Sequence, residues 1–327
     1  MIHEIAGPLV LGFVASLWSI SPALSADVAH DTADEITECD YMLSGEIVPG
    51  DLDRLTENGI FEAALERDWF DNDFVTLCLD SPGGSFAEGL QIARRLDGSN
   101  ITTVLRANAE CYSACAVAFM GGSTFMEGTW GSRKMHWTAN LGFHAPYIDL
   151  TGKEFSEQDI VSAYETGLRS VAEMMRLGAM AHPGAQGFIP SRIILELLER
   201  GPSEFFMIDS PVLAKELDIE VFGVTVPDRT IEGLCNACIV ANDGHVRYDL
   251  CERASVGFRG PDSTEISFHG VAAEGHAFCV TRLSSGPGAN GKAEITRFPV
   301  GYYTPPLDDS DFMELNPVWT LPSLGHD

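Results

Sequence analysis

Basic residues are scarce in this chain: 20 Lys and Arg stand against 48 Asp and Glu in 327 residues, and the formal net charge is −28. A surface with that charge repels the phosphate backbone of nucleic acids and anionic lipid headgroups. The sequence therefore predicts no nucleic-acid partner. The ordinary explanation of such acidity is that the surface is adapted for solubility, and this explanation does not imply a particular partner.

Long apolar runs are absent after residue 26, so the sequence predicts no later membrane-spanning segment. Residues 1–26 are apolar and end in small residues, which is the pattern of a secretory signal peptide cleaved after Ser25 or Ala26. The first residues contain no Lys or Arg, so an uncleaved membrane anchor is the alternative. We expect a periplasmic or secreted protein, with any membrane association confined to residues 1–26.

The cysteine count is even, at eight, and in an exported chain this favours disulfides. Half of the cysteines lie in the last third: Cys235, Cys238, Cys251 and Cys279. A zinc site made from these four is the weaker alternative, because spacings of 13 and 28 residues after the second of them do not match a zinc ribbon. We expect residues 227–327 to form a β-rich module held by two disulfides, with a turn at 284–292, a strand near 293–300 and a Pro- and acid-rich tail.

The rest of the chain is long enough for one full core. Residues 27–39 are acidic and are expected to form a flexible leader, and residues 40–226 alternate strand-like and helix-like segments. Strands are predicted at 74–79 and 101–105, and helices at 87–96, 113–120, 156–180 and 191–200. This alternation predicts an α/β fold with crossover connections.

Three short motifs follow predicted strands. They are D-S-P-G-G at 80–84, C-Y-S-A-C at 111–115 and G-F-H-A-P at 142–146. Loops at strand ends are where α/β folds place their chemistry, because the sheet holds them rigidly while their backbone stays accessible. Taken alone, each motif has an ordinary explanation: a turn, a helix N-cap and a surface histidine. Their occurrence in this order favours an active site.

The residue types in these motifs suit acyl transfer. Gly84 follows Pro82 and Gly83, and glycine lets a backbone N–H point into a cleft with no side chain in the way. Ser113 precedes a helix of small residues, whose N-terminus offers the N–H of Ala114 and favours negative charge. Serine needs a base to become a nucleophile, and the imidazole of His144 can act as one.

Together the motifs resemble the Clp protease proteolytic subunit and the wider Clp/crotonase superfamily. The resemblance is close over residues 75–146, looser over 147–224 and absent beyond. It implies a core built as a repeated β-β-α spiral and a serine peptidase that needs no cofactor or metal. It also implies a peptide or protein substrate, and homo-oligomers are compatible with it.

The resemblance implies a role for each motif residue. Ser113 corresponds to the nucleophile, His144 to the base, and the N–H groups of Gly84 and Ala114 to the oxyanion hole. Ser113 and His144 are 31 residues apart, slightly more than the resemblance leads one to expect, and the excess is assigned to a loop at 121–140.

The third member of a catalytic triad stays open. The resemblance places Glu204 where the family has an aspartate, Asp209 is the runner-up, and a dyad with no acid is also compatible. His136 is an alternative base, although its surroundings resemble an exposed loop.

Cys111 and Cys115 bracket Ser113 at two residues on either side. They form either a disulfide that braces the turn or a pair of small buried side chains.

Two other functions compete with peptide hydrolysis. A catalytically inactive peptide-binding or scaffold protein of the cell envelope would keep the same groove. An acyl-CoA enzyme of the crotonase type would share the oxyanion hole, but coenzyme A is cytoplasmic and an exported, acidic chain disfavours it.

Overall fold

The computed structural model describes the chain in ranges separated by gaps. The described residues are 26–30, 39–67, 73–125, 128–146, 155–179, 189–200, 204–241, 251, 255–259, 265–270, 278–283, 293–296, 309–321 and 323–324. Residues 1–25 of the predicted signal peptide and the predicted turn at 284–292 lie outside these ranges. Within them, no helix combines the length and the apolar character needed to cross a membrane.

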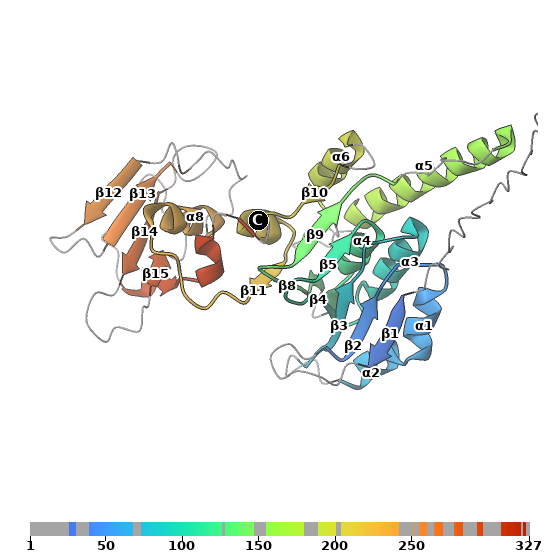
Figure 1. Ribbon diagram of the computed structural model, residues 1–327. Coiled ribbons are helices and arrows are strands. Elements are labelled where there is room, and N and C mark those ends of the chain that lie inside the picture. The colour runs from blue at the N-terminus through green and yellow to red at the C-terminus, as the bar shows by residue number, and fades with distance from the viewer. Residues whose placement is uncertain are drawn as a thin grey trace, which may run out of the picture.

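An eight-stranded sheet is the framework of the N-terminal unit (Figure 1). Its strands are β1 (Asp27–His30), β2 (Tyr41–Ser44), β3 (Val75–Asp80), β4 (Ile101–Leu105), β6 (Ser123–Phe125), β7 (Thr129–Gly131), β8 (Arg133–His136) and β11 (Glu220–Phe222). The central strands pair in parallel, β2 with β3, β3 with β4, β4 with β8 and β8 with β11. The predicted α/β fold is confirmed.

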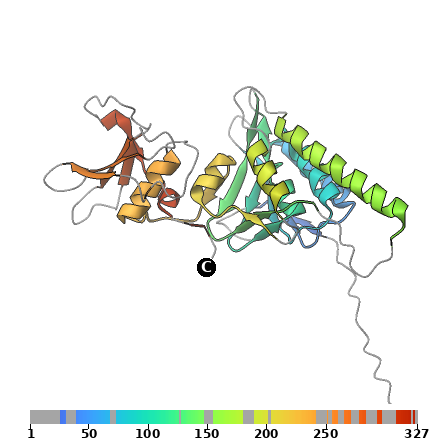
Figure 2. The same cartoon turned by 90° about the horizontal axis from the view of Figure 1, so that it is seen from above.

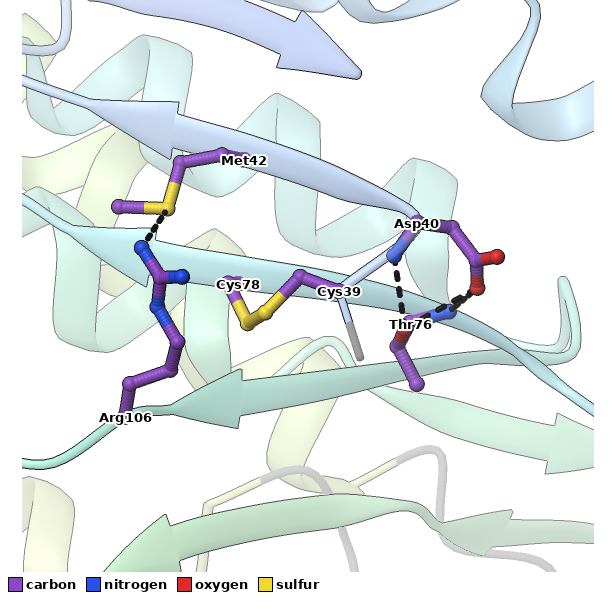
Figure 3. Close-up of a disulfide and its surroundings, with 6 residues drawn as sticks. All are labelled: Cys39, Asp40, Met42, Thr76, Cys78 and Arg106. Atoms are coloured by element: carbon purple, nitrogen blue, oxygen red, sulfur yellow. Dashed lines mark hydrogen bonds between the residues drawn. A yellow bond between two sulfur atoms is a disulfide. The ribbon is translucent and has the colours of Figure 1, made fainter. Parts of the chain in front are cut away.

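Strand β3 shows why the sheet is buried on both faces. Val75, Leu77 and Leu79 alternate along it and enter the main core, while Cys78 points to a small cluster on the other face. That second face is held by a disulfide from Cys39 to Cys78 (Figure 3). A strand that is buried on both faces has a nearly continuous apolar sequence, as this one does.

A smaller sheet stands beside the first and has the order β10-β9-β5. Its strands are β5 (Glu110–Tyr112), β9 (Asn140–Phe143) and β10 (Phe206–Met207). β5 and β9 are parallel, and β10 pairs antiparallel with β9. The second and third motifs both begin in strands of this small sheet and continue beyond its edge.

The helices of this unit are α1 (Asp51–Glu57), α2 (Ile60–Glu66), α3 (Phe86–Leu96), α4 (Ala114–Phe119), α5 (Glu157–Ala179), α6 (Ser191–Glu199) and α7 (Pro211–Glu216). Ser85 caps α3 by accepting a hydrogen bond from the N–H of Glu88. α4 is fully buried, and its small residues allow close packing: a Cβ on Gly89 of α3 would lie 2.4 Å from the carbonyl oxygen of Ala114.

Helix α5 begins with a cap formed by side chains of its first turn. Ser156 and Asp159 satisfy each other's backbone N–H groups, which is a capping-box arrangement. The helix runs alongside α3 (Figure 2), where Arg94 and Glu173 form an ion pair. The helix predicted at 156–180 is therefore confirmed over Glu157–Ala179.

The C-terminal module contains α8 (Ile231–Ala241) and a five-stranded antiparallel sheet (Figure 1). The strands are β12 (Ser255–Arg259), β13 (Glu265–His269), β14 (Phe278–Leu283), β15 (Ala293–Thr296) and β16 (Phe312–Glu314), with short 3₁₀ turns η2 (Asp309–Asp311) and η3 (Pro317–Thr320). Two disulfides tie α8 to the rest, Cys235 to Cys251 and Cys238 to Cys279. The predicted β-rich, disulfide-held module is confirmed, and these cysteines are not available as zinc ligands.

The tail after β16 returns to the N-terminal unit. Val318 and Leu324 are 3% and 0% exposed and belong to the main core. The N–H of Leu324 donates to the carbonyl oxygen of Asp209 at 2.8 Å. After residue 226 the chain leaves the N-terminal unit, and its tail later packs against that unit again. Residues 227–327 are therefore not independent of the core that precedes them.

Two expectations about loops are wrong. The leader expected at 27–39 contains β1, which pairs antiparallel with β2, and it ends at Cys39 in a disulfide. The loop expected at 121–140 forms β6, β7 and β8, because alternate residues such as Met135 reach the core while the backbone pairs with β4. In both segments long-range pairing overrides turn-like composition.

Figure 3 shows the contacts that hold residues 39–42 against β3 and the end of β4. The N–H of Asp40 donates to Thr76 Oγ1 at 2.9 Å, and the N–H of Thr76 donates to Asp40 Oδ2 at 2.8 Å. Arg106 reaches across from the end of β4 to Met42 Sδ at 3.1 Å. The disulfide thus lies in a set of contacts that join β2, β3 and β4.

Candidate active site

Strand register brings the second and third motifs together. Tyr112 of β5 pairs with Gly142 of β9, and the N–H of Ser113 donates to the carbonyl oxygen of Gly142 at 2.9 Å. Parallel strands lie about 4.8 Å apart, and these two end at the same edge of the sheet. Ser113 follows β5 directly and His144 follows β9 directly, so the two side chains leave from neighbouring strand ends.

Ser113 occupies a strained backbone conformation. Its φ is 57° and its ψ is −119°, in a region that costs a residue other than glycine about 1–3 kcal/mol. Such a sharp turn between a strand and a helix exposes the side chain at its tip, as in serine hydrolases with a nucleophile elbow. The helix that follows begins at Ala114, so the N–H of Ala114 lies at a helix N-terminus beside the serine.

The glycine segment of the first motif presents one N–H toward this turn. The carbonyl oxygen of Gly83 accepts a hydrogen bond from the N–H of Ile47 at 2.7 Å. Because N–H and C=O of a trans peptide point in opposite directions, the N–H of Gly84 points away from Ile47. β5 lies on that other side, since the N–H of Tyr112 donates to Ser81 at 3.1 Å.

Gly83 and Gly84 both need positive φ, at 101° and 138°. A Cβ on Gly83 would lie 2.7 Å from the Cβ of Ser113 and 3.3 Å from the N of Ala114. The segment is therefore packed directly against the serine turn, and only glycine fits there. Gly83 contacts the serine turn, the N–H of Gly84 points away from Ile47, and the N–H of Ala114 starts the helix after the serine.

The imidazole of His144 contacts a backbone carbonyl group and an aromatic ring. Its Nδ1 lies 2.7 Å from the carbonyl oxygen of Ala145. Its ring meets the ring of Phe205 edge-on at 5.1 Å, and Phe205 contacts Tyr112 at the same centroid distance. When Nδ1 carries the proton for this carbonyl, Nε2 keeps its lone pair and can accept a proton.

The two acid candidates lie at opposite ends of β9. Phe206 pairs with Phe143, and the contact between Phe205 and His144 continues that register by one residue. The next pair would place Glu204 across from Ala145. Asp209 instead lies near the start of β9, four residues from the level of His144, or about 13 Å along a strand.

His136 lies elsewhere. It is on β8 in the larger sheet, its Nδ1 is 2.8 Å from Thr138 Oγ1, and its ring packs edge-on against Phe222. Burial lowers the pKa of His136. The structure does not place it at the strand end that carries Ser113.

A cleft with a volume of 660 Å³ lies between α3, Pro146 and α5. It is lined by Phe86 and Ala87 of α3, by Pro146 and by one side of α5 that includes Tyr164 and Leu168. Phe86 follows Gly84 by two residues and Pro146 follows His144 by two residues. The cleft lining therefore includes one residue close in sequence to each of these two motif residues.

Sequence reasoning missed two residues of this arrangement. Phe205 packs against His144, and the β-prone pair Phe205–Phe206 was the available signal. Ile47 orients the glycine segment through a pairing between distant residues, for which the sequence offers no signal. Of the two explanations for Cys111 and Cys115, the structure shows the disulfide.

Comparison with known proteins finds a likeness among solved structures. No family model and no curated protein matches the chain. Among solved structures, the chain is similar to a point mutant of ClpP1 from Listeria monocytogenes, with 16% identity and a TM-score of 0.35. The similarity covers 55% of this chain and 89% of that one. Because a likeness at this TM-score is distant, the chemistry of the site has to be inferred from the geometry of this chain.

Proposed function

We propose that this protein is an exported serine peptidase. The observation that carries the proposal is the strained turn at Ser113, which is packed against Gly83 and lies beside a histidine at the adjacent strand end. A strained residue persists only where its surroundings hold it, and such residues concentrate at active sites. The four disulfides support an oxidising compartment.

The proposed reaction is acyl transfer to serine followed by hydrolysis. Ser113 Oγ attacks the peptide carbonyl carbon while its proton passes to His144 Nε2. The carbonyl oxygen becomes negative and accepts hydrogen bonds from the N–H groups of Gly84 and Ala114; one such donor typically lowers the barrier by ~3–4 kcal/mol. The C–N bond then breaks, and the proton on Nε2 goes to the leaving amine. Water repeats the attack on the acyl-serine and releases the acid.

The cleft beside α5 is the proposed site for the peptide. Its lining is mostly apolar and includes Phe86 and Pro146, which are close in sequence to Gly84 and His144, and Leu168 of α5. A substrate chain lying there could bury apolar side chains while its backbone passes the serine. No cofactor or metal takes part in this proposal.

Labelling with a fluorophosphonate probe tests the proposal. Only an activated serine reacts quickly, so the probe should attach to the intact protein and mass spectrometry should locate it on Ser113. Heat-denatured protein is the control and should not react. Attachment at other serines, or no attachment to folded protein, would support the inactive scaffold function instead.

Two matched substitutions test which carboxylate is the third member of the proposed triad. We propose Glu204 as the nearer carboxylate, and at a separation of ~8 Å and an effective dielectric constant of ~20–40 it would stabilise the imidazolium by ~1–2 kcal/mol. We therefore expect Glu204→Gln to lower kcat/KM about 10-fold and Asp209→Asn to leave it nearly unchanged. Equal losses would indicate a general charge effect, and no loss for Glu204→Gln would leave a serine–histidine dyad.

A further inference from the structure

The disulfide between Cys111 and Cys115 encloses the serine turn. Cys111 lies in β5 and Cys115 in the first turn of α4, both are 0% exposed, and Ser113 is midway between them. The bond therefore joins the strand before the strained residue to the helix after it. We propose that this disulfide is a positioning element that holds Ser113 in its reactive conformation, an inference that rests on the proposed peptidase function.

Contacts around Cys111 explain what the bond would hold in register. On one side Cys111 forms a bridge with Ser81 of the first motif, and on the other it pairs with Leu141 of β9. Through Cys115 the same residue is fixed to the helix that supplies the N–H of Ala114. The covalent link thus joins β5 to the serine helix, and backbone pairing joins β5 to the glycine segment and to the histidine strand.

Hydrogen bonds alone leave the turn less constrained. The N–H of Ser113 donates to Gly142, and its carbonyl oxygen accepts from Val117 at 3.1 Å. These bonds fix the two ends of the residue, while the positive φ lies between them. Without the link from β5 to α4, this backbone could relax toward an ordinary helix N-cap, and the hydroxyl would move away from His144.

Loop length argues against a purely stabilising role. In the chain-entropy model a disulfide stabilises the fold more when it closes a longer loop. Cys111 and Cys115 are separated by 4 positions, against 16, 39 and 41 for the other three disulfides. This bond is therefore expected to contribute least to overall stability, although it lies at the most strained residue of the candidate site.

Two double variants separate positioning from stability. Cys111→Ala/Cys115→Ala removes the bond at the serine, and Cys39→Ala/Cys78→Ala removes the bond shown in Figure 3. We expect the first variant to lower kcat about 100-fold, the loss typical of a reacting group displaced by ~1 Å, with KM within about twofold of wild type. We expect the second to lower the melting temperature more, because its loop is longer, and to leave kcat unchanged below that temperature.

The outcomes distinguish this inference from the function on which it rests. If Cys111→Ala/Cys115→Ala keeps its kcat while Ser113→Ala is inactive, the positioning role is overturned and the peptidase stands. Equal losses of kcat in both double variants would also overturn it, because the effect would follow stability. A wild-type protein that does not react with the fluorophosphonate probe overturns both. If the double alanine variant does not fold, Cys115→Ser, which nearly preserves side-chain volume, is measured in the same way.

Discussion

Replacing His144 with alanine should lower kcat/KM for a peptide substrate about 10⁴-fold to 10⁶-fold, the range found when one member of a serine–histidine pair is removed. The physical reason is that His144, at the strand end next to Ser113, is the proposed base. The Nδ1 of His144 faces the carbonyl oxygen of Ala145, which leaves Nε2 to accept the serine proton. Steady-state kinetics and the rate of fluorophosphonate labelling should fall together.

His136→Ala is the matched control for this prediction. His136 is half-buried on β8, away from the strand end that carries Ser113, and burial lowers its pKa. Its replacement should leave kcat/KM within about threefold, since no general base is lost. A large loss for His136→Ala with little loss for His144→Ala would exchange the two roles and contradict the strand register described above.

Much of the fold was predictable because its central elements have strong patterns. The strand predicted at 74–79 and the helix predicted at 87–96 lie within one residue of β3 and α3. The prediction for 101–105 matches β4. These segments are buried on a whole face or on both faces, so their apolar periodicity is complete in the sequence.

Short elements could not be predicted in the same way. β5, β9 and β10 have three, four and two residues, which is too few for a period-two pattern to stand out from a loop. Their existence depends on pairing between residues far apart in the chain, such as Phe143 with Phe206. For that reason the sequence could not choose between Glu204 and Asp209, whereas the register separates them along β9.

The candidate site also combines features that the sequence predicts with features that only the assembled structure shows. Residue types and their order pointed to Ser113, His144 and Gly84, because the chemistry of each is carried by its own side chain or by the lack of one. The positive φ of Ser113 is a property of the assembled turn, since serine alone would favour an N-cap conformation at a helix start. The packing of Phe205 against His144 likewise required three-dimensional contacts.

The second large expected effect is a loss of stability when the C-terminal tail is removed. A chain that ends at Asn316 loses Val318 and Leu324, which are buried in the main core. Burying a side chain of this kind contributes roughly 1.5–3 kcal/mol, so we expect the truncated protein to lose about 3–6 kcal/mol of unfolding free energy. Domains are typically stable by only about 5–15 kcal/mol, and a much lower melting temperature should follow. This expectation replaces the sequence-based one, in which residues 227–327 form a module of their own.

Two leucines make the test specific. Leu324 is 0% exposed and its N–H donates to Asp209, whereas Leu65 on α2 is 86% exposed. Leu324→Ala should cost about 2–5 kcal/mol in chemical denaturation, and Leu65→Ala should stay within about 0.5 kcal/mol of wild type. Because Asp209 directly follows the residue that bonds to Leu141 of β9, losing the tail should also loosen the strand that carries His144. Unchanged stability and unchanged labelling in the truncated chain would mean that the tail contributes nothing to the core, and residues 227–327 would then be a separable module after all.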